Sequence, residues 1–204
     1  MKSFKYAALI LAGLLTVTSA ASCGKKKIIE PVSTVDAENP PTNVYAENTE
    51  IGVNQFKADL STEISANDTA FTLNSVIDTG YRENDKKYIY LDVTINNSTD
   101  SGYELSTLNN FYLKLSDGTE VYSDIVTSLY AMANFNENTY SKDPFNIPAK
   151  GQFSGIIGGF VVDENVDTFT VGFFPTQSLV NDKDDVCLID ITPDKITTRT
   201  DLLK

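Results

Sequence analysis

The chain has no histidine and no tryptophan, and only two of its 204 residues are cysteine. Histidine is the commonest general base and the commonest zinc ligand, and two cysteines do not complete a structural zinc site. Several classes of enzyme and metal site are therefore excluded. Basic residues are also scarce, since 16 Lys and Arg stand against 28 Asp and Glu and give a net charge of -12. A surface this acidic repels polyphosphate, and we expect no nucleic-acid partner.

The hydrophobic run near the N-terminus is too short for a permanent membrane helix. Residues 6–17 are mostly apolar, follow Lys2 and Lys5, and are succeeded by the small residues 18–22. As a helix this run would span about 18 Å, against roughly 30 Å of hydrocarbon. The pattern is typical of a cleaved secretory signal peptide, which we assign to residues 1–22.

A cysteine follows the small residues. The segment Ala20-Ala21-Ser22-Cys23-Gly24 resembles the lipobox of bacterial lipoproteins, although Ala20 stands where leucine is commonest. In that motif the cysteine is linked to diacylglycerol, and two or more acyl chains hold a protein durably on a bilayer. We predict lipidation of Cys23 and a location on the extracytoplasmic face of the cell membrane. The alternative is ordinary secretion with an unmodified Cys23.

Residues 23–67 show no sustained apolar period and are rich in Glu, Asn, Thr, Ser and Pro. Lys25, Lys26 and Lys27 either add attraction to anionic head groups or are part of a solvated spacer. The composition predicts a flexible linker between the lipidated N-terminus and a folded domain at residues 68–204. Whether residues 51–64 pack on that domain is left open.

From residue 68 the pattern changes to strict alternation. Ile89, Leu91, Val93 and Ile95 share one parity and Tyr90 the other, which is typical of a half-buried strand with Tyr90 outward. A Ser-Asp-Gly-Thr turn at 116–119 predicts a hairpin. Helical periodicity is weak, and at most a turn is expected within 51–64 or 125–133. The pattern predicts an all-β fold, an antiparallel sandwich. Further strands are expected at 70–77, 111–115, 151–162, 167–174 and 186–191.

Three segments together resemble a known family. Residues 87–98 form a strand ending in Asn-Asn, residues 111–118 end in Ser-Asp-Gly, and residues 147–155 contain Ile-Pro-Ala-Lys-Gly before Phe-Ser-Gly. This pattern resembles the telokin-like, immunoglobulin-like domain of uncharacterised bacterial surface lipoproteins, over roughly residues 65–175. The resemblance implies an immunoglobulin-like sandwich related in fold to a mycobacterial secreted immunoprotective antigen. It implies no catalytic residue.

Each candidate for chemistry has a simpler structural interpretation. The acidic segment 181–185 offers oxygens to calcium but lacks the spacing of an EF-hand, and we expect a solvated loop and no metal site. We expect the carboxylates of Asp163 and Glu164 to be ordinary surface charges. Cys187 shares strand parity with Ile189 and is expected in the core rather than as a reactive thiol. We predict no enzymatic activity and no cofactor.

The longest connection, residues 124–148, is rich in aromatic residues. Tyr130, Phe135 and Tyr140 stand among Asn and Ser, a mixture found at interfaces. One interpretation is that these side chains fold back and plug an open end of the sandwich. The other is that they form a patch that contacts a protein or a glycan.

Three functions remain at this point. The first is a lipid-anchored, non-enzymatic binding module for an unknown surface protein or wall polymer. The second is a solute-binding lipoprotein serving a transporter, which normally needs two α/β lobes. The third is a passive structural protein of the envelope.

Overall fold

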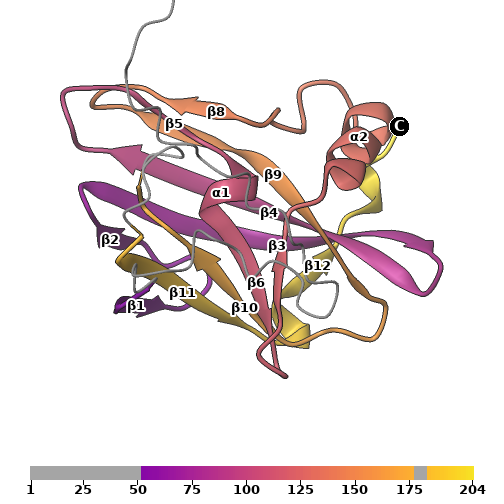
Figure 1. Cartoon of the computed structure of the whole chain (residues 1–204). Coiled ribbons are helices and arrows are strands. Elements are labelled where there is room, and N and C mark those ends of the chain that lie inside the picture. The colour runs from indigo at the N-terminus through magenta and orange to yellow at the C-terminus, as the bar shows by residue number, and fades with distance from the viewer. Residues whose placement is uncertain (1–51, 177–182) are drawn as a thin grey trace, which may run out of the picture. The chain divides into compact units, whose positions relative to one another are not determined.

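The computed structural model describes residues 52–176 and 183–204, which belong to one compact unit in which strands dominate (Figure 1). The predicted signal peptide, Cys23 and the first part of the predicted linker lie outside the described residues. Because the sequence alternates apolar and polar residues over long stretches, each strand has one face suited to a core and another suited to water or to a second cover.

One sheet has five strands and is antiparallel except at one edge. Gly118, at a φ of +90°, makes the turn of the predicted hairpin between β6 and β7, in a backbone region that glycine adopts without strain. The edge strand β1 runs parallel to β11. The strand order is β1 (Asn54–Ala58), β11 (Asp185–Ile191), β10 (Phe169–Phe173), β6 (Phe111–Leu115) and β7 (Glu120–Tyr122).

The second sheet faces the first. Its order is β12 (Ile196–Thr198), β3 (Thr69–Glu83), β4 (Lys86–Asn97) and β9 (Gln152–Asp163), with β2 (Ile64–Ala66) also paired to β3. Here too one edge strand, β12, is parallel to its neighbour. A separate pair consists of β5 (Tyr103–Leu105) and β8 (Phe145–Ile147). The helices are α1 (Thr107–Asn110) and α2 (Ile125–Asn134), and two 3-10 turns are η1 (Pro193–Lys195) and η2 (Thr200–Leu202).

The core lies between these two sheets. Phe71 from the second sheet packs against Phe111 and Phe173 from the first, with ring centroids 6.0 Å and 4.6 Å away. Ile89, Leu91, Val93 and Ile95 of β4 are all fully buried in the same cluster. The all-β sandwich predicted from the alternation is therefore confirmed, with two parallel edge pairs in an otherwise antiparallel arrangement.

The folded part begins earlier than the sequence indicated. Residues 54–58 and 64–66, which the sequence assigned to the linker, form β1 and β2 and pair with β11 and β3. This corrects the predicted boundary at residue 68. A short edge strand turns few apolar side chains inward, here Phe56 and Ala58, and so leaves no sustained period in the sequence.

Tyr90 differs from the expectation for β4. Its parity is opposite to that of Leu91, as predicted, yet its side chain is fully buried rather than exposed. The outer face of the β3–β4–β9 sheet is covered by α2 and the C-terminal segment, and the C-terminus lies beside α2 (Figure 1). The sheet is thus buried on both faces in this region, which a half-buried strand pattern does not predict.

Candidate functional site

Helix α2 is longer and better capped than the sequence suggested. Asp124 is its N-cap, and the carboxylate of Asp124 accepts a hydrogen bond from the Val126 amide at 2.9 Å. The helix has ten residues, against the single turn expected. A helix this short has little stability of its own, so its contacts with the sheet hold it in place.

Those contacts centre on Thr127, which is fully buried. Its hydroxyl donates to the Gly159 carbonyl oxygen at 2.8 Å and accepts from the Gly159 amide at 3.0 Å. Its own carbonyl oxygen accepts from the Tyr90 hydroxyl at 2.7 Å. Gly159 has to be glycine here, because a Cβ would lie 2.7 Å from the Ile89 carbonyl oxygen and 2.9 Å from the Tyr90 ring.

The three aromatic residues predicted for a partner patch point inward. Phe135 is 2% exposed, and its ring centroid lies 4.9 Å from that of Tyr90. Tyr130 packs on Tyr81 with centroids 4.4 Å apart, and Tyr140 lies 6.1 Å from Tyr90. The side chains fold back as the plug interpretation expected, but they cover the outer face of the β3–β4–β9 sheet rather than an open end of the sandwich. The patch hypothesis is therefore corrected for Phe135, which cannot reach a partner while α2 is folded.

Burial also sets the ionisation of these side chains. Loss of hydration raises the pKa of the Tyr90 hydroxyl well above its ordinary value, and it likewise raises the pKa of Tyr140 and Tyr130. All three hydroxyls are neutral at physiological pH and act as hydrogen-bonding groups. They do not supply a base to this site.

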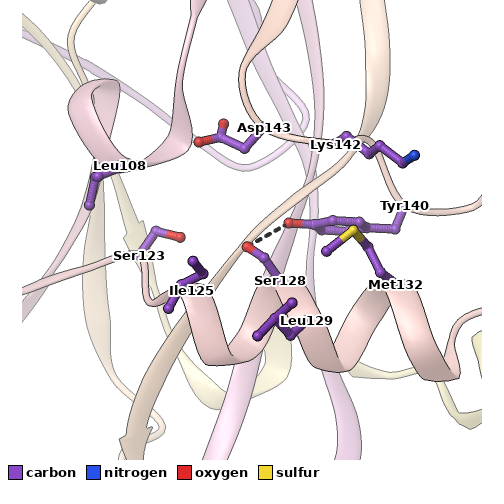
Figure 2. A pocket seen from close by; sticks show the side chains of 9 residues that line it. All are labelled: Leu108, Ser123, Ile125, Ser128, Leu129, Met132, Tyr140, Lys142 and Asp143. Atoms are coloured by element: carbon purple, nitrogen blue, oxygen red, sulfur yellow. Dashed lines mark hydrogen bonds between the residues drawn. The ribbon is translucent and has the colours of Figure 1, made fainter. Parts of the chain in front are cut away.

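The opposite side of α2 carries the apolar surface. Ile125 is 74% exposed and Leu129 55% exposed, and Met132 follows one turn later. With Leu108 of α1 across from them, these side chains line a groove of about 340 Å³ (Figure 2). Contiguous apolar surface of this kind on a folded protein marks an interaction site more often than chance exposure does.

Few polar groups border the groove, and most are engaged. The Tyr140 hydroxyl contacts Ser128 Oγ at 3.0 Å and donates to the Gly158 carbonyl oxygen. The two oxygens of Asp143 accept from Ser106 Oγ at 2.7 Å and from the Thr107 amide at 2.6 Å. Lys142 is exposed, and within the described residues it makes no hydrogen bond or ion pair. The groove therefore offers a ligand apolar contacts and the charge of Lys142.

Sequence reasoning missed Leu108 and Ile125 and gave no separate role to Leu129 and Met132. A signal was present, because Ile125, Leu129 and Met132 are spaced i, i+4 and i+7. On an isolated helix, that stripe would be taken for the buried face. In this protein the buried side is made by Thr127, Ala131 and the half-buried Tyr130, so only the tertiary structure shows which side remains free.

The other sequence candidates have structural roles where they are described. Cys187 is fully buried, and burial, with a smaller effect of Asp185, raises its pKa to about 12, so the core interpretation is confirmed. Of the acidic segment, residues 181 and 182 lie outside the described residues, and Asp185 accepts from the Asn54 side chain at 2.9 Å. Asp163 and Glu164 pair with Lys86 and Arg82 at the surface.

The described part of the chain is residues 52–176 and 183–204. In that part of the chain no group of three metal-ligating side chains comes together. Over the same residues no helix has the length and apolar character needed to cross a bilayer.

Comparisons with known proteins leave the chain without a family. No family model and no curated protein matches it. Solved structures that resemble it include a "putative lipoprotein" of Bacillus subtilis, at 17% identity and a TM-score of 0.46, covering 66% of this chain and 39% of that one. The chain thus spans about two-fifths of that protein's length.

Two further structures resemble the chain to a similar degree. An uncharacterised β-sandwich protein of Clostridium difficile is 13% identical with a TM-score of 0.44, covering 71% of this chain and 99% of that one. The secreted protein MPT63 of Mycobacterium tuberculosis is 14% identical with a TM-score of 0.44, covering 68% and 99%. These similarities are too distant to assign a function, and the fold assignment rests on the strands of the chain itself.

Proposed function

We propose that the protein is a lipid-anchored lipoprotein of the extracytoplasmic membrane face whose β-sandwich is a non-enzymatic binding module. The anchor is supported by the signal-peptide pattern of residues 1–22 and by the small residues before Cys23. The immunoglobulin-like, telokin-like family assignment is part of the same proposal, supported by the three sequence segments described above.

The observation that carries the binding role is the free apolar side of α2. On the surface of a monomeric soluble protein, exposed large apolar side chains are normally scattered rather than grouped. Here Ile125, Val126, Leu129 and Met132 are all exposed on one ten-residue helix. The same helix is held firmly to the sheet through Thr127, so the exposed side is presented on a fixed support.

The absence of enzymatic activity is proposed from the chemistry of the groove. The chain has no histidine, and the carboxylate of Asp143 is already held by Ser106 and Thr107. The Ser128 hydroxyl is hydrogen-bonded to the Tyr140 hydroxyl, which is neutral. These groups support binding better than proton transfer.

Anchoring is tested with Cys23→Ser in the natural cell. We expect the variant to leave the membrane fraction and appear in the medium, because the cleaved protein without acyl chains is not anchored to the bilayer. Intact mass of the wild type should exceed that of the cleaved chain by a diacylglyceryl group. A wild-type protein with a free Cys23 thiol and no detergent partitioning would contradict the proposal.

Binding is tested by placing a photo-crosslinking amino acid at Leu129 in the full chain on intact cells. We expect a discrete adduct there and none from the matched exposed position Lys114, which lies on the other sheet. Equal labelling at both positions, or none at either, would favour a passive envelope protein instead.

A solute-binding role is the second candidate, because a groove of about 340 Å³ falls within the range of about 300–1,000 Å³ that small ligands occupy. A rise in melting temperature with an added small solute, lost in Leu129→Gln, would support this role.

A further inference from the structure

The apolar side of α2 is a stripe that ends in charge of opposite sign. Ile125 begins the helix and Met132 lies near its end, with Leu129 at the middle of the ten residues. The carboxylates of Asp124 and Asp143 lie at the N-terminal end, and the ammonium group of Lys142 lies toward the C-terminal end (Figure 2). Each end therefore complements the other.

The placement of these charges follows from contacts. Asp124 caps the helix, and Asp143 is held against Ser106 and Thr107 beside α1. Lys204 donates from its side chain to the Ala133 carbonyl oxygen at 3.2 Å, which fixes it at the helix C-terminus. Figure 2 shows the Asp143 carboxylate directed toward Leu108 and the Lys142 chain directed the opposite way, past Tyr140 and Met132.

We propose that the partner bound by this side of α2 is a second copy of the chain, with the two α2 helices antiparallel across a two-fold axis at Leu129. The inference rests on the proposed binding function and names its partner. In this arrangement the acidic end of each helix meets the basic end of the other. The two helix dipoles are also opposed, which is the favourable orientation for neighbouring helices.

Shape supports the same pairing. Ile125 is the most exposed of these side chains, at 74%, and the groove between α2 and Leu108 offers a recess of about 340 Å³. Across a two-fold axis each copy supplies both the projecting side chain and the recess, as an isologous interface requires. Ile125 and Val126 would both be covered, whereas a small solute in the groove leaves the outer side of Val126 in water.

An occupant of one charge sign fits less well. An anionic partner would meet Lys142 at one end but Asp124 and Asp143 at the other, and a cationic partner would meet the reverse. The chain as a whole carries a net charge of -12, so two copies repel each other at long range. A contact that places Lys142 of each copy against carboxylates of the other offsets that repulsion locally.

The test uses cysteine crosslinking on intact cells with the full-length protein. The wild type has only Cys23, the predicted lipidation site, and the buried Cys187, so an introduced surface cysteine reports its own surroundings. With copper phenanthroline as oxidant, Leu129→Cys should form a disulfide-linked dimer, because residues at a two-fold axis approach within disulfide reach. Wild type and Lys114→Cys are the controls and should stay monomeric.

Antiparallel geometry makes a second demand. Two copies of residue 125 lie four residues to either side of the axis, roughly 12 Å apart along the helices, which is too far for a disulfide. Ile125→Cys alone should therefore not crosslink. Ile125→Cys combined with Met132→Cys should, since residue 125 of one copy lies near residue 132 of the other.

Charge provides a third readout. Lys142→Glu should lower the Leu129→Cys crosslink yield roughly tenfold, because the two-fold axis repeats the exposed ion pair and the substitution removes both copies, while Lys57→Glu at the exposed edge strand β1 should not. Crosslinking by Ile125→Cys alone as strongly as by Leu129→Cys would overturn the antiparallel pairing.

Failure of this inference is distinguishable from failure of the proposed function. If the photo-crosslinker at Leu129 captures a different molecule and no cysteine dimer forms, the binding module stands and the second copy is rejected. If neither reagent gives an adduct at Leu129, both proposals are rejected.

Discussion

The two faces of the β3–β4–β9 sheet are both buried, but they are covered by different means. The inner face packs against the other sheet through aliphatic and phenylalanine side chains such as Leu91 and Phe160. The outer face is covered by α2 and the C-terminal segment, and tyrosines predominate there, with Tyr90 donating to the Thr127 carbonyl oxygen at 2.7 Å. The inner cover depends on apolar area alone, whereas the outer cover depends also on a few hydrogen bonds.

This difference determines which of the two covers can also expose a binding surface. A face buried by a second sheet has no side left for a partner. A helix laid on a sheet covers one side and exposes another, and α2 exposes Ile125 and Leu129 there. The outer cover therefore contributes to the stability of the domain and also presents the surface on which both proposals rest.

The largest expected effect tests whether the outer face is as well packed as the inner one. Tyr90→Ala should lower the free energy of unfolding by about 3–5 kcal/mol, at least as much as the 2–5 kcal/mol expected for Leu91→Ala. Both side chains are fully buried, and Tyr90 also loses its bond to Thr127. Urea unfolding measures both. If Tyr90→Ala lowered the free energy of unfolding by less than half as much as Leu91→Ala, α2 would not cover the sheet as described.

The second prediction addresses the hydrogen bonds beneath α2. Thr127→Val keeps the volume but leaves the amide and carbonyl of Gly159 without a side-chain partner, and should cost about 1–3 kcal/mol. Hydrogen exchange should show α2 opening more often while β4 keeps its protection. If the loss appeared equally in β4, the two covers would unfold as one unit and the contrast between them would disappear.

A third prediction uses pH. Burial favours the neutral form of Asp78, but the hydrogen bonds from Arg82 and from the Gly80 amide, with the nearby positive charges, outweigh it and lower the pKa of the carboxyl. A lowered pKa in the folded state contributes stability that is fully present above the unfolded value of about 4 and is lost as the pH falls through the folded value.

Arg82→Gln removes the part of this contribution that Arg82 supplies and leaves the hydrogen bond from the Gly80 amide. Since Arg82 is about a third exposed, we expect a loss of about 1–2 kcal/mol at pH 7 rather than the value for a fully buried pair. The difference from wild type should shrink as the pH falls from about 4 toward 2, because both proteins then carry a protonated Asp78. Urea unfolding at several pH values measures it, with Lys57→Gln as an exposed control. A difference that stays constant with pH would contradict the assigned pair.

The smallest effect concerns the helix cap. Asp124→Ala should lower the free energy of unfolding by about 1 kcal/mol, because the Val126 amide loses its acceptor. Asp124→Asn, which can still accept that bond, should recover most of the loss. Thermal melting of the three proteins distinguishes the cap from a general effect of charge, which would make Asn and Ala equally costly.

Much of the sandwich was predictable because its signal is local. Alternation over 88–95, 111–115 and 186–191 predicts strands whatever the rest of the chain does, and β4, β6 and β11 include these residues. The turn at Gly118 and the burial of Cys187 followed from the same reasoning. The parallel edge strands β1 and β12 did not, because pairing between segments far apart in the chain leaves no local period.

By itself, the sequence determined the fold class and the parity of β4, since both depend on neighbouring residues. The export and lipidation signals ahead of the domain are local patterns too, and they stay predictions. Only the tertiary structure decided which cover lay over Tyr90, that Tyr130, Phe135 and Tyr140 point inward, and that Ile125, Leu129 and Met132 remain free. The reason is physical. An apolar stripe on a short helix is equally suited to a core or to an interface, and the difference depends on whether another part of the chain reaches it. In this protein the sheet occupies the Thr127 and Ala131 side of α2, and the other side is exposed.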